Sequence, residues 1–341
     1  MEPKQRLKSF IKLGELLDNL ETTKLRQLKS RAFKENTWFT NENIDFALKG
    51  VISYLDQGQL IPWLKGYHIK PNREVDVGII MAGNIPLVGF HDFLCVIMSG
   101  NSALVKISSK DSIVTKFLFK KLTEVDPNMK NQFRLVNKLN KASAVIATGS
   151  DNSARYFNHH YKDCPRLIRK NRTSVAIIRG DETQDQLTKL GDDIFQYFGL
   201  GCRNISKLYV PKGYDIRAAM GNFQAYEHLI DHTSYSNNYL YNKTKFLMKG
   251  VNFIDTGFLL VVKDKDLVSP ISVLFYEEYL DTNQLNTILN REAPSIQCII
   301  SGEGWYNNSI PFGSSQLPKV WDYQDNVDTM RFLIDKVGIA K

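Results

Sequence analysis

The chain has 341 residues, of which 43% are hydrophobic and 23% charged, and a formal net charge of +8. It contains no biased or low-complexity tract, so its composition excludes a disordered or fibrous protein and fits a globular one large enough for two domains. The positive charge suits phosphate-bearing ligands, acidic proteins or nucleic acid, and it does not choose among them.

Residues 1–70 are predicted to form a helical N-terminal segment. Apolar residues recur every three or four positions in LKSFIKLGELLDNL and in NENIDFALKGVISYLDQGQLIPWL, and Thr40 or Asn41 is expected to cap the second helix. Charged and apolar residues are mixed from the start of this segment, so it lacks the uninterrupted apolar core of a signal peptide. We therefore expect a cytoplasmic protein.

The longest apolar stretch, VGIIMAGNIPLVGFHDFLCVIMSG, approaches the length of a membrane span. Polar or helix-breaking residues interrupt its middle, at Asn84, Pro86, His91 and Asp92. We interpret it as a buried strand, a turn and a helix, without membrane insertion.

Residues 71–200 are predicted to form a doubly wound α/β domain that binds a dinucleotide. The short apolar runs VDVGIIMAG, SALVKIS, ASAVIATGS and TSVAIIRG are typical of buried parallel strands, and segments of helix length separate them. A second α/β domain is expected over residues 201–315. It begins with SKLYVPKG and a helix from about Ile216 to His232, followed by strands KFLMKGV, GFLLVVKD, SVLFYEEYL and IQCIISGE. Residues 316–341 are expected to return to the body of the protein.

The four cysteines lie too far apart for a zinc site or a disulfide framework. Three of them are expected to be small buried apolar residues, namely Cys95, Cys164 and Cys298. Cys202, in FGLGCRNISKLYVP, has a different context. Glycines precede it at positions 199 and 201, and Arg203 and Lys207 would favour its thiolate if they lie nearby. The local sequence makes Cys202 a candidate nucleophile, with a buried apolar role as the alternative.

Polar residues follow three of the predicted strands. Asn84 is either a turn residue or a ligand contact, and Lys106 is either a solvated strand end or a ribose or phosphate contact. Gly149 and Ser150 precede a helix, where they could bind an anion or only cap the helix. The spacing of His228 and His232 could bind zinc, but no third ligand is recognisable, so we expect a polar helix face or a substrate-contact surface and no metal.

The order of these motifs resembles the aldehyde dehydrogenase superfamily. That superfamily carries Asn-Phe-Pro, Gly-Asn-Thr-x-x-x-Lys-Pro-Ser, Thr-Gly-Ser and Gly-Gln-x-Cys, which match NIP at residues 84–86, GNSALVK at 100–106, TGS at 148–150 and the cysteine at 202. PFGSS at 311–315 and DLVSP at 266–270 resemble two later elements. The short chain and its helical start are most similar to the acyl-CoA reductases related to the fatty-acid reductase of bacterial bioluminescence.

The resemblance implies roles for seven residues. Cys202 would attack the acyl carbonyl, and the Asn84 amide with the Cys202 backbone N–H would stabilise the oxyanion. The remaining five would contact the cofactor: Lys106 and Ser109 at the adenosine ribose, Gly149 and Ser150 near the dinucleotide, and Asp266 at the nicotinamide ribose.

Two departures from the superfamily pattern refine the expected reaction. No glutamate occurs between Asp151 and Asp181, where dehydrogenases carry the base that activates water. Ser109 replaces a glutamate common in NAD-preferring members, which favours NADPH while leaving NADH possible. We expect NADPH-dependent reduction of a fatty acyl-CoA or other acyl thioester to the aldehyde through an acyl-cysteine.

Three alternatives remain open, namely an aldehyde dehydrogenase, an acyl-phosphate reductase and a non-catalytic acyl-binding subunit. The expected partners are the acyl-CoA or acyl-carrier substrate, an acyltransferase and a second copy of the chain, but no nucleic acid.

Overall fold

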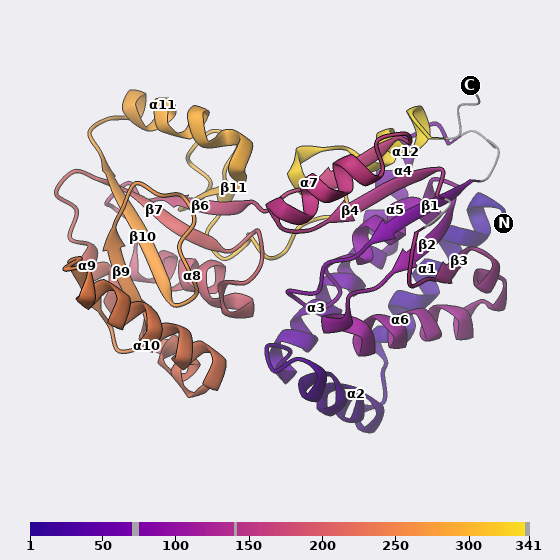
Figure 1. Cartoon of the computed structure of the whole chain (residues 1–341), viewed down its shortest axis with the longest axis horizontal. Coiled ribbons are helices and arrows are strands. Elements are labelled where there is room, and N and C mark those ends of the chain that lie inside the picture. Colours follow the sequence, from indigo (N-terminus) through magenta and orange to yellow (C-terminus); the bar gives the residue numbers. More distant parts are fainter. Residues whose placement is uncertain (70–74, 140–141, 338–341) are drawn as a thin grey trace. The chain divides into compact units, whose positions relative to one another are not determined.

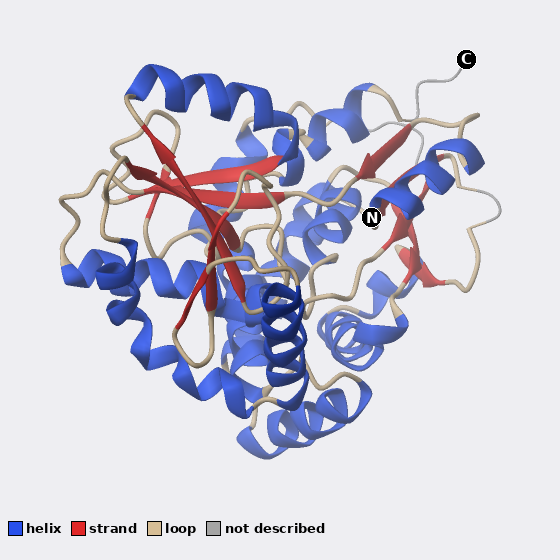
Figure 2. Cartoon of the chain, turned by 60° about the vertical axis from the view of Figure 1, so that its left-hand side comes forward, coloured by secondary structure: helices blue, strands red, loops and turns tan. Residues whose placement is uncertain are grey.

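The computed structural model describes residues 1–69, 75–139 and 142–337. The chain divides into two compact units (Figures 1 and 2). Unit 1 comprises Met1–Asn171 and Pro318–Lys341, and unit 2 comprises Arg172–Leu317. The boundary expected at residues 70 and 71 lies outside the described residues. None of the described helices combines the length and the apolarity needed to span a membrane.

Unit 1 begins with helices, as predicted: α1 (Pro3–Asp18), α2 (Thr22–Glu35), α3 (Asn41–Leu55) and α4 (Gln57–Lys65). Thr40 caps α3, because its side chain accepts a hydrogen bond from the Asn43 N–H at 3.3 Å. The backbone at Asp56 is extended, with φ −61° and ψ 133°, so the long helix predicted here is two helices. Phe10 and Leu13 of α1 are fully buried and help form the core beneath the adjoining sheet.

The sheet of unit 1 has five parallel strands in the order β3-β2-β1-β4-β5. These strands are β1 (Asp76–Ile80), β2 (Ser102–Lys106), β3 (Phe133–Leu135), β4 (Ala144–Thr148) and β5 (Arg166–Arg169). The connecting helices are α5 (Phe90–Met98), α6 (Ser112–Val125) and α7 (Asp151–His160), and α7 lies on the opposite side of the sheet from α6 (Figure 1). After β3 the chain returns to the far side of β1, so the strand order reverses between β1 and β4. Ligands of open α/β sheets bind beside the carboxyl ends of the strands at such a point.

The C-terminal segment, which includes α12 (Thr329–Asp335), belongs to unit 1 through a buried polar network. Arg169 is 1% exposed and donates to Asp92 Oδ1 at 2.8 Å, Thr329 Oγ1 at 2.8 Å and the Gln324 carbonyl at 2.7 Å. A buried charge requires such partners, so this arginine of the basic RLIRKNR stretch has a structural role.

The sheet of unit 2 has seven strands in the order β12-β11-β6-β7-β10-β9-β8, and among its described strands only the β8–β9 pair is antiparallel. They are β6 (Thr173–Ile177), β7 (Ile205–Pro211), β8 (Phe253–Asp255), β9 (Leu260–Lys263), β10 (Val273–Tyr279), β11 (Ile296–Ser301) and β12 (Ile310–Pro311). Figure 1 shows α11 (Thr282–Glu292) on one face, with α8 (Gln184–Phe195) and α10 (Thr233–Met248) on the other.

The second unit differs from the sequence prediction in three places. The run TSVAIIRG, assigned to the first sheet, forms β6 between β11 and β7, so the change of unit falls between residues 171 and 172 instead of 200 and 201. The helix predicted from Ile216 to His232 is the short α9 (Ile216–Met220) followed by the 3-10 helix η4 (Gly221–Asp231). KFLMKGV, predicted as a strand, ends α10, because Tyr239 and Phe246 are buried at helical spacing.

Candidate active site

Cys202 lies in a turn of unit 2 immediately before β7, and it is half-buried. The buried side chain of Asn204 organises this turn. Its Oδ1 accepts the Gly201 N–H at 2.8 Å, and its Nδ2 donates to the carbonyls of Gln196 at 2.7 Å, Asp193 at 3.2 Å and Ile194 at 3.3 Å. One amide therefore joins the end of α8 to the turn that carries the thiol.

The backbone that leads into this turn is strained. In η3 (Gln196–Gly199), Tyr197 has φ 55° and Phe198 has φ 58°, followed by Gly199 at φ 77°. The left-handed conformation costs a residue other than glycine roughly 1–2 kcal/mol. The Phe198 ring is held 4.5 Å from His232 and 6.0 Å from Tyr235, between ring centroids. Such strain persists where the surroundings fix the backbone, and it concentrates at functional sites.

Ser174 of β6 connects Cys202 to a second thiol. Its hydroxyl is 3.0 Å from the Cys202 carbonyl oxygen, 3.2 Å from the Cys298 nitrogen and 2.9 Å from the Cys298 Sγ. A carbonyl only accepts, so the single hydroxyl proton is donated to Cys202, and Cys298 donates its N–H and its S–H to Ser174. Cys298, expected to be a buried core residue, is instead half-buried and part of the support of the Cys202 turn.

Two irregularities in the sheet create this arrangement. The β6–β7 register shifts between Ser174 and Val175, and the β6–β11 register shifts between Ile296 and Ile299. A bulge leaves backbone groups unpaired and re-aims side chains, and bulges are frequent near active sites. Here the Ser174 hydroxyl accepts the Cys298 N–H that a regular ladder would pair with a backbone carbonyl.

Asp193 holds the PFGSS motif in the same region. This carboxylate of α8 is 0% exposed and accepts the N–H of Gly313 at 2.6 Å and of Ser315 at 2.9 Å. Burial raises the pKa of Asp193 to about 6. Arg203, next to the candidate nucleophile, donates to the Ser315 carbonyl at 3.4 Å. The motif and the Cys202 turn are therefore neighbours in unit 2.

Lys207 does not have the role that the sequence suggested. It is 1% exposed, and its ammonium group lies 2.6 Å from Glu277 and donates to the Lys265 carbonyl at 2.8 Å. An ammonium compensated by a carboxylate adds little to the field at a thiol. Of the two cations that the sequence suggested for stabilising the Cys202 thiolate, only Arg203 keeps that role as a candidate.

Asp266 lies exposed in the turn between β9 and β10. The next residue, Leu267, accepts a hydrogen bond from the Ser206 hydroxyl at 2.7 Å. Ser206 also accepts from the Thr173 hydroxyl at 2.7 Å. The turn that carries Asp266 is thereby tied to the beginning of β7, close along the chain to Cys202.

The other predicted site residues gather at one edge of the sheet of unit 1. Asn84 follows β1, Lys106 ends β2 with Ser109 just beyond it, and Gly149 and Ser150 follow β4. Because β2, β1 and β4 are adjacent and parallel, all five lie at their common carboxyl edge. These five residues belong to unit 1, whereas Cys202 and Asp266 belong to unit 2.

Two loops of this edge touch. The Met81 N–H donates to the Lys106 carbonyl at 3.0 Å. A Cβ placed on Gly83 would stand 2.4 Å from the Ser108 Oγ, so only glycine allows the loop of Asn84 to approach the loop of Ser109 this closely.

Asp111 fixes the same pair of loops, and no motif in the sequence pointed to it. Its Oδ2 accepts the N–H of Leu87, a residue at φ 58°, at 2.8 Å, and the hydroxyl of Thr115 at 3.0 Å. Its Oδ1 is buried without a hydrogen-bond partner among the described residues. Burial raises the pKa of Asp111 to about 7.

Ser150 caps α7, since its hydroxyl accepts the Ser153 N–H at 3.4 Å. A Cβ on Gly149 would lie 2.8 Å from the Ser153 Cβ, so the strand turns tightly into the helix here. Ser150 therefore caps the helix, which was one of the two roles considered for it. This role is compatible with an anion near the other N–H groups of the first turn.

The two histidines considered for zinc do not share one α-helix. His228 lies in η4 and pairs through Nδ1 with the Ala225 carbonyl, whereas His232 caps α10. Within the described ranges, no group of three or more His, Cys, Asp or Glu side chains is placed to hold a metal ion.

Comparison with known proteins decides the family. A family model described as acyl-CoA reductase (LuxC) matches residues 9–219, more than half of the chain. The chain belongs to the LuxC acyl-CoA reductase family. This family membership places it among oxidoreductases that act on acyl or aldehyde groups. No curated protein matches the sequence significantly.

Solved aldehyde dehydrogenases share the fold of this LuxC family member. Aldehyde dehydrogenase 21 from Physcomitrella patens, in complex with succinate, has a TM-score of 0.71 at 12% identity over 99% of this chain and 85% of its own. A mutant of aldehyde dehydrogenase C from Pseudomonas syringae, with NAD+ and octanal, has a TM-score of 0.65 at 12% identity over 88% and 72%. An NAD-dependent aldehyde dehydrogenase from Sinorhizobium meliloti has a TM-score of 0.66 at 14% identity over 93% and 72%. These likenesses confirm the predicted α/β fold.

Proposed function

We propose that this LuxC family member reduces an acyl thioester to the aldehyde with NADPH through an acyl-cysteine on Cys202. The observation that carries the proposal is the support of the Cys202 turn. Asn204 and Ser174 fix the backbone on either side of a half-buried thiol, and a strained segment leads into it. A nucleophile held in one geometry has less orientation to lose on reaching the transition state.

The chemistry would begin with the Cys202 thiolate attacking the thioester carbonyl carbon. A new C–S bond forms to Cys202 and the C–S bond to the donor breaks, so the donor leaves as a thiolate. The developing oxyanion would be stabilised by the Cys202 N–H and by the Asn84 amide, the role that the resemblance gives Asn84. One such donor typically lowers the barrier by about 3 kcal/mol.

Hydrolysis of the acyl-cysteine should be slow. No glutamate lies between Asp151 and Asp181, and Glu182, the first one after this stretch, already accepts the N–H of Arg179 at 2.6 Å and of Gly180 at 2.9 Å. Without a carboxylate base, water is a weak nucleophile toward a thioester. The intermediate would therefore persist until it is reduced, which favours a reductase over an aldehyde dehydrogenase.

The carboxyl edge of β1, β2 and β4 has the donor set for a nicotinamide dinucleotide. Lys106, Ser109 and Lys110 are exposed at the end of β2. The nearby carboxylate of Glu35 is already engaged by the N–H groups of Ser112 and Ile113 at 3.0 and 3.1 Å. Cations and hydroxyls suit the 2′-phosphate of NADPH, and NADH would also be accepted. When bound, the cofactor would supply the hydride, and Asp266 would hold its nicotinamide ribose.

The test is to incubate the full chain with acyl-CoAs of several lengths and to follow its intact mass. The protein should gain one acyl group without cofactor and release free aldehyde when NADPH is added. Cys202→Ala should gain none, whereas Cys298→Ala should still be acylated, because its Sγ only supports the turn.

Other outcomes would assign other functions. Full acylation of Cys202→Ala refutes the proposed nucleophile. Carboxylic acid formed from an aldehyde would indicate a dehydrogenase, and turnover of an acyl phosphate alone would indicate an acyl-phosphate reductase. Acylation without NADPH consumption would indicate an acyl-binding subunit, and acylation only by an acyltransferase or acyl carrier would identify the donor.

A further inference from the structure

Helix α10 of unit 2 has two apolar faces. One face packs against the sheet, where Tyr239 and Phe246 join a buried cluster with Leu260 and Val262 of β9. The opposite face carries four large apolar side chains that remain exposed: Leu240 at 57%, Tyr241 at 67%, Leu247 at 63% and Met248 at 84%. A helix that only covers a sheet has a polar outer face, whereas the outer face of α10 is apolar and is left uncovered by the described part of unit 2.

The exposed residues are arranged symmetrically about Thr244, which is itself exposed. Leu240 and Tyr241 precede it by four and three positions, and Leu247 and Met248 follow it by three and four. Residues three and four apart lie on one helix face, so the five residues form a single stripe with a small side chain at its centre. We call it the α10 stripe.

A stripe with this symmetry is complementary to itself. When two copies of α10 pack antiparallel with Thr244 at the crossing, Leu240 meets Met248 of the other copy and Tyr241 meets Leu247 of the other copy. Each contact then occurs twice, as an isologous twofold interface requires. The small Thr244 side chain permits close approach of the two helices at the axis.

The area of the stripe is sufficient for a dimer. A large side chain of this kind contributes on the order of 150–250 Å² when buried, so the four exposed fractions give on the order of 500 Å² per copy. Complete burial of the stripes of two copies would remove at most about 1,000 Å² of surface from water, which meets the lower limit for a specific interface.

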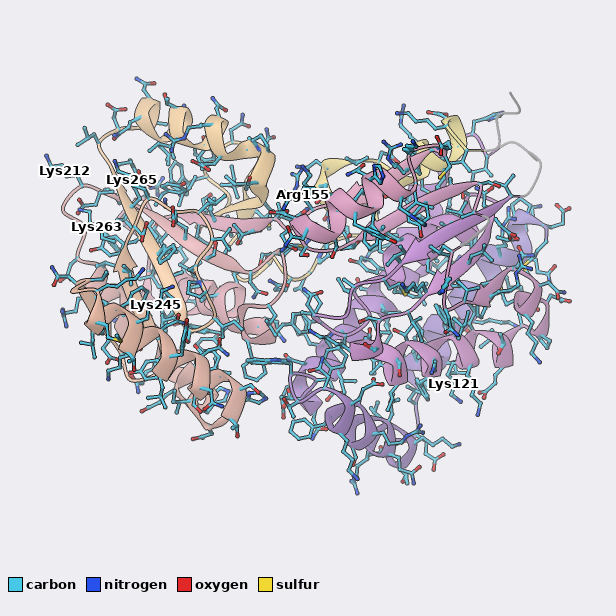
Figure 3. The ribbon with its side chains drawn as sticks, viewed as in Figure 1. Lys121, Arg155, Lys212, Lys245, Lys263 and Lys265 are labelled. Atoms are coloured by element: carbon cyan, nitrogen blue, oxygen red, sulfur yellow. The ribbon has the colours of Figure 1, made fainter. Side chains whose placement is uncertain are left out.

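The charges near the stripe favour a second copy over a membrane surface. Lys243 is compensated by Asp255 at 2.7 Å, and the exposed cations that follow are Lys245, labelled in Figure 3, and Lys249. A helix that lies on a membrane carries many lysines and arginines on its polar face. The face of α10 opposite the stripe is buried in unit 2 instead.

We propose that the protein forms a twofold dimer through antiparallel packing of the α10 stripes of two copies. This proposal does not depend on the reaction proposed above. Every substitution in such an interface acts twice, so one charged residue in the stripe has a large effect on the dissociation constant.

The first test is the mass of the full chain in solution, measured by analytical ultracentrifugation up to about 100 µM. Wild type should be a dimer at the higher concentrations, and Leu247→Asp should raise the dissociation constant on the order of 100-fold or more. Leu280→Asp is the matched control, because Leu280 is 64% exposed but lies outside α10, and it should dimerise as wild type does. Circular dichroism checks that each variant is folded.

The second test is the register. Mixing Leu240→Cys with Met248→Cys should give a disulfide-linked heterodimer on mild oxidation, whereas neither variant alone should cross-link efficiently, because the proposed packing holds two copies of the same position apart. A monomer at every concentration, or a dimer that tolerates Leu247→Asp, overturns the proposal. So do equal cross-linking of all combinations, and binding of the monomer to lipid vesicles through the stripe.

Discussion

Replacing Asn204 with alanine removes the side chain that joins α8 to the Cys202 turn. Asn204 is 2% exposed, and its two amide hydrogens serve three carbonyl oxygens while its Oδ1 accepts the Gly201 N–H. The variant therefore loses about three hydrogen bonds, and several buried backbone groups lose their hydrogen-bond partner. A buried polar group left without a hydrogen bond costs roughly 1–3 kcal/mol, so we expect the free energy of unfolding to fall by about 3–5 kcal/mol.

The assay combines urea unfolding with the rate at which iodoacetamide alkylates Cys202. Alkylation should become faster in Asn204→Ala, because the turn that half-buries the thiol loosens, while the rate at Cys164 in unit 1 serves as internal reference. Asn242→Ala is the control, since Asn242 is equally buried but, within the described part of the chain, makes one side-chain hydrogen bond, to the Ile271 carbonyl at 3.0 Å. This role of Asn204 is refuted if Asn204→Ala is no less stable than Asn242→Ala and Cys202 reacts at an unchanged rate.

Three further changes test other parts of the structure. Asp111→Asn should remove a pH dependence: because burial raises the pKa of Asp111 from 3.8 to about 7, its contribution is present below about pH 4 and lost as the pH rises to 7. Urea unfolding should thus show wild type losing about 3–4 kcal/mol relative to the variant over that interval, and parallel profiles would contradict this. Arg169→Met should lower the free energy of unfolding by about 3–5 kcal/mol by leaving Asp92 buried and unpaired, and adding Asp92→Leu should restore much of the thermal stability. Ser174→Ala should lower the rate of acyl transfer to Cys202 about tenfold or more, since the Cys202 carbonyl loses its support; Cys298→Ala should have a smaller effect, and equal effects of both would assign the role to the thiol.

The sequence predicted the features that depend on local pattern. Short apolar runs bounded by glycine became β1, β2 and β4, and the residues expected at their ends share one sheet edge. Local sequence does not determine which strands pair with one another. TSVAIIRG was therefore correctly predicted to be a strand but wrongly assigned to the first sheet. KFLMKGV was misassigned because its apolar run looks continuous, although only Phe246 of the three residues 246–248 is buried.

The supports of the Cys202 turn could not be found in the same way. Ser174 and Cys298 are 124 residues apart, and Asp193 and Ser315 are 122 apart. Such contacts exist only after the sheet has formed, and a serine or an aspartate in an apolar segment carries no mark of the partner that will satisfy it. The one available signal was Asp193, which lies on the apolar side of α8. A carboxylate that is buried there requires hydrogen-bond donors from another part of the chain.

The return of the C-terminal segment to unit 1 makes unit 2 an insertion within unit 1, with consequences for synthesis on the ribosome. Residues 172–317 emerge from the ribosome as one continuous segment. Arg169 cannot form its hydrogen bonds to Gln324 and Thr329 until all of this insertion has been translated. The nascent first unit therefore holds a guanidinium that is paired with Asp92 but lacks its two C-terminal hydrogen-bond partners, and at about 5–20 residues per second this period lasts many seconds.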